Sequence, residues 1–346
     1  MRTKKIALTV ALWILGEVAL SAQQTFNTTI YYDYTYNLTN DGYKTLSQKD
    51  LNNRFNFRRA YFTFENKTSD VLKFRFRYDA DYVTALDAKG NKDDKLRPFL
   101  KHLYVDYAGL FPNSSLKIGM IETLTFKIAE DRWSYRSVAK TLTDNYKDVT
   151  GKDIKASSAD VGASLTGSLM KEIRYGFMVM NGAGYAHPEA DKFKKFAGQL
   201  QLVPLAGLSL VGYIDSEKQT PTGKAYTYKL DGYFEMIQGL TLGGEWFTYD
   251  NGNNKNADLS HYNVSGYSVF GRVVGVRDKL NFFARYDRYN PNTTLSNDET
   301  NLVIAGVDWA PVHSSFKLQP NIWYYNYSDS AKKADTAFNL TFYFSF

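Results

Sequence analysis

The basic residues with the most regular spacing lie in the stretch Leu72–Tyr82, where Lys73, Arg75 and Arg77 take every second position. The positions between them are apolar or aromatic, and the charged positions continue into two aspartates. Because a strand sends alternate side chains to opposite faces, the stretch predicts one apolar face and one charged face. A row of cations on a wet face attracts anions. This stretch alone leaves open whether the apolar face meets a protein core or lipid.

Four further arginines extend this basic pattern. Arg58 and Arg59 lie in the preceding apolar segment, where the alternation changes phase and so predicts a β-bulge. Arg272 and Arg285 have the same parity as the polar residues of two later segments. Adjacent antiparallel strands would bring the first pair within a Debye length, ~8 Å, of the basic row. The candidate anion-attracting residues are therefore Arg58, Arg59, Lys73, Arg75, Arg77, Arg272 and Arg285.

The longest connection between strand-like segments, residues 122–159, carries charges of both signs. Folded into a barrel, it would narrow the pore and create a transverse field opposite a basic wall. The candidate constriction residues are Lys127, Glu130, Asp131, Arg132, Arg136 and Lys140. The alternative is that any water-filled pore lines itself with charges and pairs some of them, and the charge pattern alone favours that interpretation.

Strand-like alternation recurs from residue 25 onward, and no stretch shows a sustained apolar period of about 3.6 residues. The predicted strands, about sixteen, are residues 25–38, 54–64, 71–82, 100–107, 116–121, 160–169, 173–180, 196–203, 208–214, 225–236, 240–248, 264–274, 280–289, 302–309, 316–325 and 336–346. Long and short connections alternate between them. This is typical of a transmembrane antiparallel β-barrel with short periplasmic turns and long extracellular loops, and it places both termini on the short-turn side.

The two ends of the sequence favour export to an outer membrane. Residues 1–22 hold a basic start, an apolar run and small residues suited to a signal-peptidase site, so we expect a signal peptide there and a barrel over residues 23–346. The last strand alternates aromatic residues and ends on Phe346. A terminal strand of this kind resembles the insertion signal read by the barrel-assembly machinery. In water, an edge so aromatic and free of charge would invite aggregation.

Composition agrees with a wide barrel. The chain has 346 residues, 16% of them aromatic, no cysteine and a mean hydropathy of −0.41, which alternating strands explain because their faces average out. About sixteen strands are too many for side chains to fill, so an aqueous channel is expected. Zero cysteines exclude disulfides and thiol chemistry. The mildly basic net charge of +6 fits an anion preference without requiring one.

Three places in the sequence resemble the family named after the phosphate-selective porins O and P. They are residues 57–64 with the turn and strand that follow, residues 116–121 before the long connection, and residues 158–167 after it. The resemblance implies an outer-membrane barrel, usually a homotrimer, with an inward-folded loop and often an anion or phosphate preference. Only the pair Arg58 and Arg59 sits on a matching motif, and Glu130 and Asp131 argue against strict phosphate selectivity.

Other classes of function have weaker support. An outer-membrane enzyme would need a histidine poised beside a nucleophile, and none of His102, His187, His261 and His313 sits in such a motif. A surface adhesin or receptor would need specific loops, and the loops show no such signal. We therefore expect a passive channel for small hydrophilic solutes and ions with a mild anion preference. Its partners would be the lipid bilayer and lipopolysaccharide, with no metal, cofactor or nucleic acid.

Overall fold

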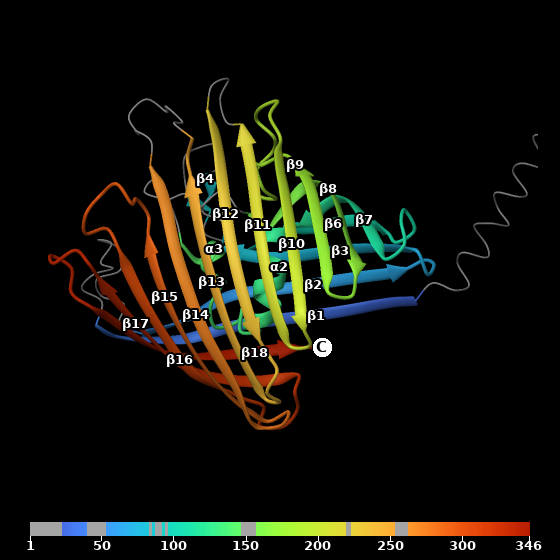
Figure 1. The fold of residues 1–346 in the computed structure, drawn as a ribbon. Coiled ribbons are helices and arrows are strands. Elements are labelled where there is room, and N and C mark those ends of the chain that lie inside the picture. Colours follow the sequence, from blue (N-terminus) through green and yellow to red (C-terminus); the bar gives the residue numbers. More distant parts are fainter. Residues whose placement is uncertain are drawn as a thin grey trace, which may run out of the picture.

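The computed structural model describes residues 23–39, 53–82, 85–86, 92–93, 96–146, 157–218, 223–252 and 262–346. Sixteen strands of these residues form a closed antiparallel barrel, as the sequence predicts (Figure 1). A separate pair of two-residue strands, β4 and β5, lies in the connection between β3 and β6. The expected signal peptide, residues 1–22, lies outside the described residues.

The strands run in sequence order around the barrel, and β1 pairs with both β2 and β18 to close it. Their bounds are β1 Gln23–Thr39, β2 Asn53–Lys67, β3 Leu72–Tyr82, β4 Ala85–Leu86, β5 Lys92–Asp93, β6 Leu96–Tyr107, β7 Ser114–Glu122, β8 Ala159–Met170, β9 Ile173–Met180, β10 Lys195–Leu205, β11 Leu208–Lys218, β12 Lys224–Phe234, β13 Leu240–Asp250, β14 Asn263–Val276, β15 Leu280–Asn290, β16 Thr300–Trp309, β17 Phe316–Tyr327 and β18 Asp335–Ser345.

The connections fall into two classes that alternate along the chain. Those at the end that holds both termini span two to six residues, and those at the other end span five to 36. Short turns face the periplasm in barrels of this kind, and longer loops face the outside. The predicted alternation is confirmed, and the longest connection, residues 123–158, is the one predicted to fold inward.

Each strand has one face toward lipid and one toward the interior. In β12, Lys229 and Asp231 are buried inside, whereas Tyr228 and Leu230 point outward and are exposed. In β3, Leu72 and Tyr78 are exposed on the outward face, and the basic row faces the interior, as the alternation of this strand predicts. The alternate positions that hold polar residues point inward. The barrel wall therefore presents charged side chains to the inward loop and to solutes in the lumen.

Two β-bulges interrupt the pairing beside the basic row. The register between β1 and β2 shifts so that Tyr31 pairs with Arg59 and Tyr32 with Phe57, which leaves Arg58 as the extra residue. This confirms the predicted bulge. A second shift leaves Lys101 as the extra residue of β6 opposite β3. A bulge turns consecutive side chains to one face, so adjacent basic residues can both point inward.

The connection 123–158 holds the two helices of the described residues, α2 Leu124–Trp133 and α3 Leu142–Asn145, and both lie inside the ring of strands (Figure 1). The sequence showed no helical period here because α2 is short and is packed on several sides. It ends where Ser134 adopts a left-handed conformation, φ 61°, and the N–H of Ser134 donates to the carbonyl of Glu130 at 2.8 Å. Within the described ranges, no helix has the length and apolar character needed to cross a membrane.

Candidate functional site

The inward loop, residues 123–158, is tied to the barrel where it starts. Thr123 Oγ1 donates to the carbonyl of Ser157 at 2.7 Å, which joins the two ends of the loop. Gln199 Nε2 donates to the carbonyl of Leu124 at 2.8 Å, and Lys229 Nζ donates to the next carbonyl, of Thr125, at 3.2 Å. The first turn of α2 is therefore held against β10 and β12.

Apolar side chains of the inward loop pack against the inner face of β11 to β16. Trp133, Tyr135, Val138 and Ala139 meet six wall residues, which are Val211, Tyr233, Phe270, Phe283, Leu302 and Ile304. Farther along, Tyr146 stacks on Tyr289 with ring centroids 4.3 Å apart, beside Leu142 and five further wall residues. Trp133 is fully buried. The loop therefore fills this side of the lumen, and open space remains on the side of β2, β3 and β6.

Two of the predicted anion-attracting arginines hold the middle of the inward loop. Arg58 Nη1 donates to the carbonyls of Ser137 at 2.7 Å and Val138 at 2.9 Å, and it pairs with a carboxylate, Asp33, at 3.0 Å. Arg285 donates to the carbonyl of Lys140 at 2.6 Å and forms two hydrogen bonds with Asp287, each 2.7 Å long. Their guanidinium groups are used to fix the loop, since backbone carbonyls accept strongly from a cation.

The open side of the lumen contains a cavity of about 260 Å³, which we call the eyelet, between α2 and strands β2, β3 and β6. Cations from both sides reach it, together with three carboxylates and two aromatic rings. The lining residues are Tyr61, Arg75, Arg77, Lys101, His102, Glu122, Thr123, Phe126, Lys127, Glu130, Asp131, Arg136 and Ser158. Five of these are Arg or Lys and three are Asp or Glu, so the eyelet has a basic excess.

A second cavity, of about 400 Å³, lies toward the periplasmic turns and shares Arg75, Glu122 and Lys127 with the eyelet. Lys73 and Lys117 line it as well. Inward positions along β3 are two residues apart, or ~7 Å. The basic row therefore runs from the periplasmic opening to the eyelet, with successive cations closer than the Debye length at physiological ionic strength.

Most eyelet cations have a carboxylate partner. Arg75 pairs with Glu65 and, at 2.6 Å, with Glu122. Lys127 pairs with Asp131 on α2. The expectation that wall charges pair internally is thus met at these positions. Pairing lowers the net field of each cation but leaves donors facing the cavity, because a carboxylate cannot occupy every N–H of a guanidinium group.

A buried triad stands at the extracellular side of the eyelet. The carboxylate of Asp79, which is fully buried, pairs with Arg59 and, at 3.2 Å, with Lys101. The ring of Tyr61 lies beneath these cations, with Lys101 Nζ 5.1 Å from its centroid. Two cations share one carboxylate here, so the triad keeps a net positive charge.

Arg77 differs from its neighbours. Its Nε donates to Thr63 Oγ1 at 2.8 Å, and its guanidinium carbon lies 5.0 Å from the ring centroid of Tyr61. Within the part of the chain that the structure describes, Arg77 forms no ion pair with a carboxylate. An anion in the eyelet can therefore meet Arg77 without displacing an acidic side chain.

The acidic side chains of the inward loop respond to burial in opposite ways. Burial raises the pKa of Glu130, and the ion pair with Arg136 opposes this effect. Burial would also raise the pKa of Asp144, but the positive charges of Arg136 and Lys140 outweigh it and lower that pKa. Glu130 is therefore the first of the two to lose its charge as the pH falls.

The predicted site residues divide into three groups. Arg75, Arg77, Lys127, Glu130, Asp131 and Arg136 meet at the eyelet, and Lys73 lies below it. Arg58 and Arg285 hold the loop, and Arg59 belongs to the buried triad. Arg132 pairs with Glu235 at 2.5 Å, Arg272 lies 3.9 Å from the same glutamate, and Lys140 lies 3.5 Å from Asp144. The predicted anion-attracting residues therefore do not all line the open path: some lie at the eyelet, and others hold the inward loop.

Four residues of the site were not among the sequence-based candidates: Lys101 and Glu122 at the eyelet, Lys117 in the second cavity, and Lys229 as a loop anchor. Lys101 has the parity of the lipid-facing residues of β6, and only the bulge turns it inward. Two adjacent polar residues, Lys101 and His102, interrupt the apolar alternation of this strand. This is the same sequence signal for a β-bulge that Arg58 and Arg59 give. Glu122 accepts from Tyr104 at 3.1 Å and lies 3.3 Å from Lys117, contacts that involve the two neighbouring strands β6 and β7.

Comparison with known proteins agrees with this geometry. The family model described as phosphate-selective porin O and P matches residues 26–123, which extend from β1 to the start of the inward loop. The resemblance read from the sequence is confirmed. No curated protein sequence matches the chain.

Solved structures share the architecture over almost the whole chain. The anion-selective porin from Comamonas acidovorans has a TM-score of 0.66 at 10% identity, covering 94% of this chain and 100% of that one. This chain has the porin fold. The outer membrane channel DcaP of Acinetobacter baumannii scores 0.61 at 11% identity (94% and 98% covered), and the trimer form of OmpT from Vibrio cholerae scores 0.60 at 12% (94% and 99%). At these identities, the porin fold is what the likeness establishes.

Proposed function

We propose that the protein is an outer-membrane porin, a passive diffusion channel for small hydrophilic solutes and ions with a mild anion preference set at the eyelet. The observation that carries the proposal is the basic excess around the cavity between α2 and the wall of β2, β3 and β6. The porin fold and the family match support a channel rather than an enzyme.

In this proposal, a solute passes between α2 and the basic row of β3. Lys127, Glu130 and Asp131 lie on the α2 side, and Arg75 and Arg77 lie on the wall. An anion gains attraction along the basic row and meets the N–H donors of Arg77, which replace part of its hydration shell. The carboxylates of α2 limit this attraction, so anions are favoured but not trapped. Rapid release requires such weak binding.

The same proposal places the mature chain in the outer membrane of a Gram-negative cell as a homotrimer. The strand order and the aromatic last strand support insertion through the barrel-assembly machinery by way of Phe346. One of the structurally similar proteins is described in a trimer form, which supports the trimer for this chain. Chemical crosslinking of the detergent-extracted protein tests it, and a product no larger than a dimer would contradict it.

Reconstitution in planar bilayers tests the channel function. Purified protein should give discrete conductance steps in KCl, and the ion current should carry more chloride than potassium. Added phosphate should compete with chloride at the eyelet and reduce the current at fixed ionic strength. A folded, inserted protein that shows no steps would contradict the channel function. A current dominated by potassium would contradict the anion preference.

A further inference from the structure

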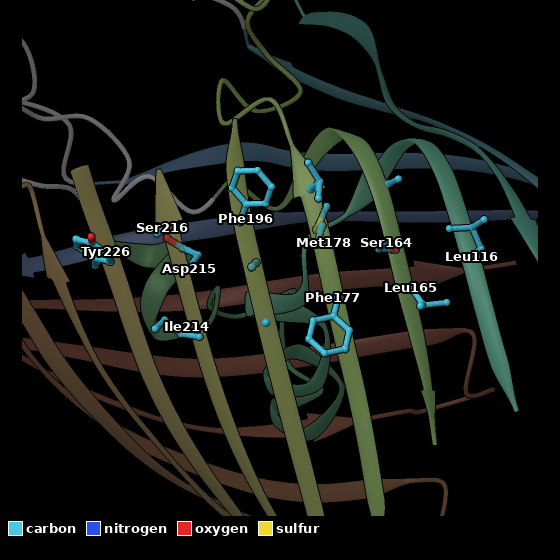
Figure 2. Close-up of a pocket in the computed structure, with 14 residues that line it drawn as sticks. Leu116, Ser164, Leu165, Phe177, Met178, Phe196, Ile214, Asp215, Ser216 and Tyr226 are labelled. Atoms are coloured by element: carbon cyan, nitrogen blue, oxygen red, sulfur yellow. The ribbon is translucent and has the colours of Figure 1, made fainter. Parts of the chain in front are cut away.

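The outer surface of the barrel has an apolar groove of about 620 Å³ over β7 to β12. Phe177, Phe196 and Ile214 stand around it on three neighbouring strands, with outward positions exposed by 60%, 57% and 47% (Figure 2). Its floor is low because Gly198 occupies the outward position between Phe177 and Ile214, and Ala163 occupies the outward position beside Val179 on the next strand, β8. The groove is hollowed into the lipid-facing band, so it presents a channel for an extended hydrocarbon chain.

The extracellular end of this groove leads to two opposed lysines. Ser216 pairs with Tyr226 at the end of the groove, and Lys218 pairs with Lys224 two residues farther on, ~7 Å along the strands. All four residues have outward parity. Like charges directly opposite each other in a sheet are destabilising, so the pair favours an anion between or above its two ammonium groups.

Lys192 lies close to the two lysines, and neither of the two lysines has a carboxylate partner among the described residues. In the described part of the chain, neither Lys218 nor Lys224 forms an ion pair, and the sequence of residues 219–222 that joins them has no acidic side chain. Lys218 and Lys192 lie 5.3 Å and 5.8 Å from the ring centroid of Phe193.

Two acidic side chains lie nearby on the connection between β9 and β10, and both have other contacts. Glu189 accepts from Lys194 at 2.9 Å. Asp191 accepts from the backbone N–H of Phe193 at 2.7 Å. Within the described residues neither carboxylate forms an ion pair with Lys192, Lys218 or Lys224, so these three ammonium groups can contact a ligand at this rim.

We propose that this surface binds a phosphorylated, acylated lipid of the outer leaflet, with its phosphate at Lys218 and Lys224 and an acyl chain in the groove. Charge complementarity selects this occupant: apolar lining below and opposed cations above match the two ends of an anionic amphiphile. The inference rests on the outer-membrane location in the proposed function, because that location puts the loop end of the barrel in the phosphate-rich leaflet. It does not depend on ion conduction.

Native mass spectrometry of the full-length protein in detergent, titrated with lipopolysaccharide, tests the proposal. Replacing both lysines, Lys218→Gln with Lys224→Gln, should weaken binding by about 30-fold, the factor for two basic residues at an anionic surface. Gly198→Leu should also weaken binding by filling the groove. An added Cβ there meets only Ile214 Cγ2, at 3.9 Å, so the backbone is not strained.

Matched controls distinguish a site from a general effect. Lys332→Gln with Lys333→Gln removes two lysines from another extracellular loop, and Gly232→Leu adds a leucine at another lipid-facing glycine, whose Cβ would meet Leu210 at 3.7 Å. Both controls should bind as the wild type does, and dephosphorylated lipopolysaccharide should bind wild type as weakly as the lysine variant binds the intact lipid.

Three results would overturn the proposal. One is equal binding by the lysine variant and the wild type. Another is equal binding of intact and dephosphorylated lipid. The third is a Gly198→Leu variant that loses oligomers while it keeps the lipid, because this would assign the groove to a second copy of the chain. Bilayer conductance is measured in parallel, so failure of the lipid site and failure of the channel function are separate outcomes.

Discussion

Arg58 Nη1 donates a hydrogen bond to the backbone carbonyl of Ser137 at 2.7 Å, which links the bulge of β2 to the middle of the inward loop. The bulge makes this contact possible, because Arg58 is the extra residue and points inward beside Arg59. A residue expected to attract anions is thus a structural anchor. The arginines that line the eyelet and those that hold the inward loop are the same residue type at different positions along the barrel wall.

Removing this anchor should loosen the inward loop. Arg58→Met keeps most of the side-chain volume but leaves Asp33 and two loop carbonyls without their donor, which should cost about 1–3 kcal/mol. Denaturant unfolding in detergent measures the loss, and single-channel recordings should show larger open-state current fluctuations. Arg277→Met, in an exposed periplasmic turn, is the control. A variant with wild-type stability and current noise would show that the apolar contacts hold the loop unaided.

The apolar contacts make a separate contribution. Trp133→Ala removes the largest fully buried side chain of the interface between loop and wall and should destabilise the protein by about 3–5 kcal/mol. If the loop separates from β14 and β15, the single-channel conductance should rise, because the filled side of the lumen opens. Trp246→Ala, at a lipid-facing position, is the matched control and should change neither quantity much. Unchanged conductance in a destabilised Trp133→Ala protein would contradict the conclusion that the inward loop closes this side of the lumen.

The buried triad should be sensitive to loss of its one carboxylate. Asp79→Asn removes the buried carboxylate that Arg59 and Lys101 share, and breaking a buried pair of this kind costs about 3–5 kcal/mol. Urea unfolding of the variant against wild type measures the effect, with the exposed Asp278→Asn as control. A change below about 1 kcal/mol would indicate that water already stabilises these cations.

Selectivity should depend on pH through Glu130. Burial raises the pKa of Glu130, whereas the pKa of Asp144 is lowered, so lowering the pH from 7 to 5 should protonate a larger share of Glu130 than of Asp144. The eyelet then gains positive charge, and the anion preference should increase. Reversal potentials at the two pH values measure this, and Glu130→Gln should give a high anion preference at both. An equal pH response in Glu130→Gln would assign the titration to another group.

The sequence predicts the barrel well because its signals are local or repeat many times. Alternation along Leu72–Tyr82 predicts which face is charged, and the phase change near Arg58 predicts the bulge. The recurring strand-like segments predict about sixteen strands, the alternation of connection lengths predicts the barrel, and the length of residues 122–159 predicts the inward loop. Each of these signals lies within one strand or one connection or repeats along the chain, so it can be recognised without knowing which strands pair.

The parts that could not be predicted depend on contacts between distant residues. Arg285 and Lys140 are 145 positions apart, and no local pattern indicates that one donates to the other. The helix α2 is defined by packing against β10, β12 and β13, so its sequence has no clear apolar stripe of its own. Whether an arginine lines the passage or anchors the loop follows from these long-range contacts.

Arg77 should contribute most to the anion preference, because it is the eyelet arginine without a carboxylate partner among the described residues. The most direct measurement is the reversal potential of a tenfold KCl gradient across planar bilayers, for wild type and for Arg77→Gln. The wild type should be chloride-selective, and the chloride-to-potassium permeability ratio should be lower by about two- to fivefold in the variant, the effect of one charge a few ångströms from the ion path. Arg277→Gln, in the periplasmic turn, should keep the wild-type ratio. A cation-selective wild type, or a ratio unchanged by Arg77→Gln, would contradict this prediction.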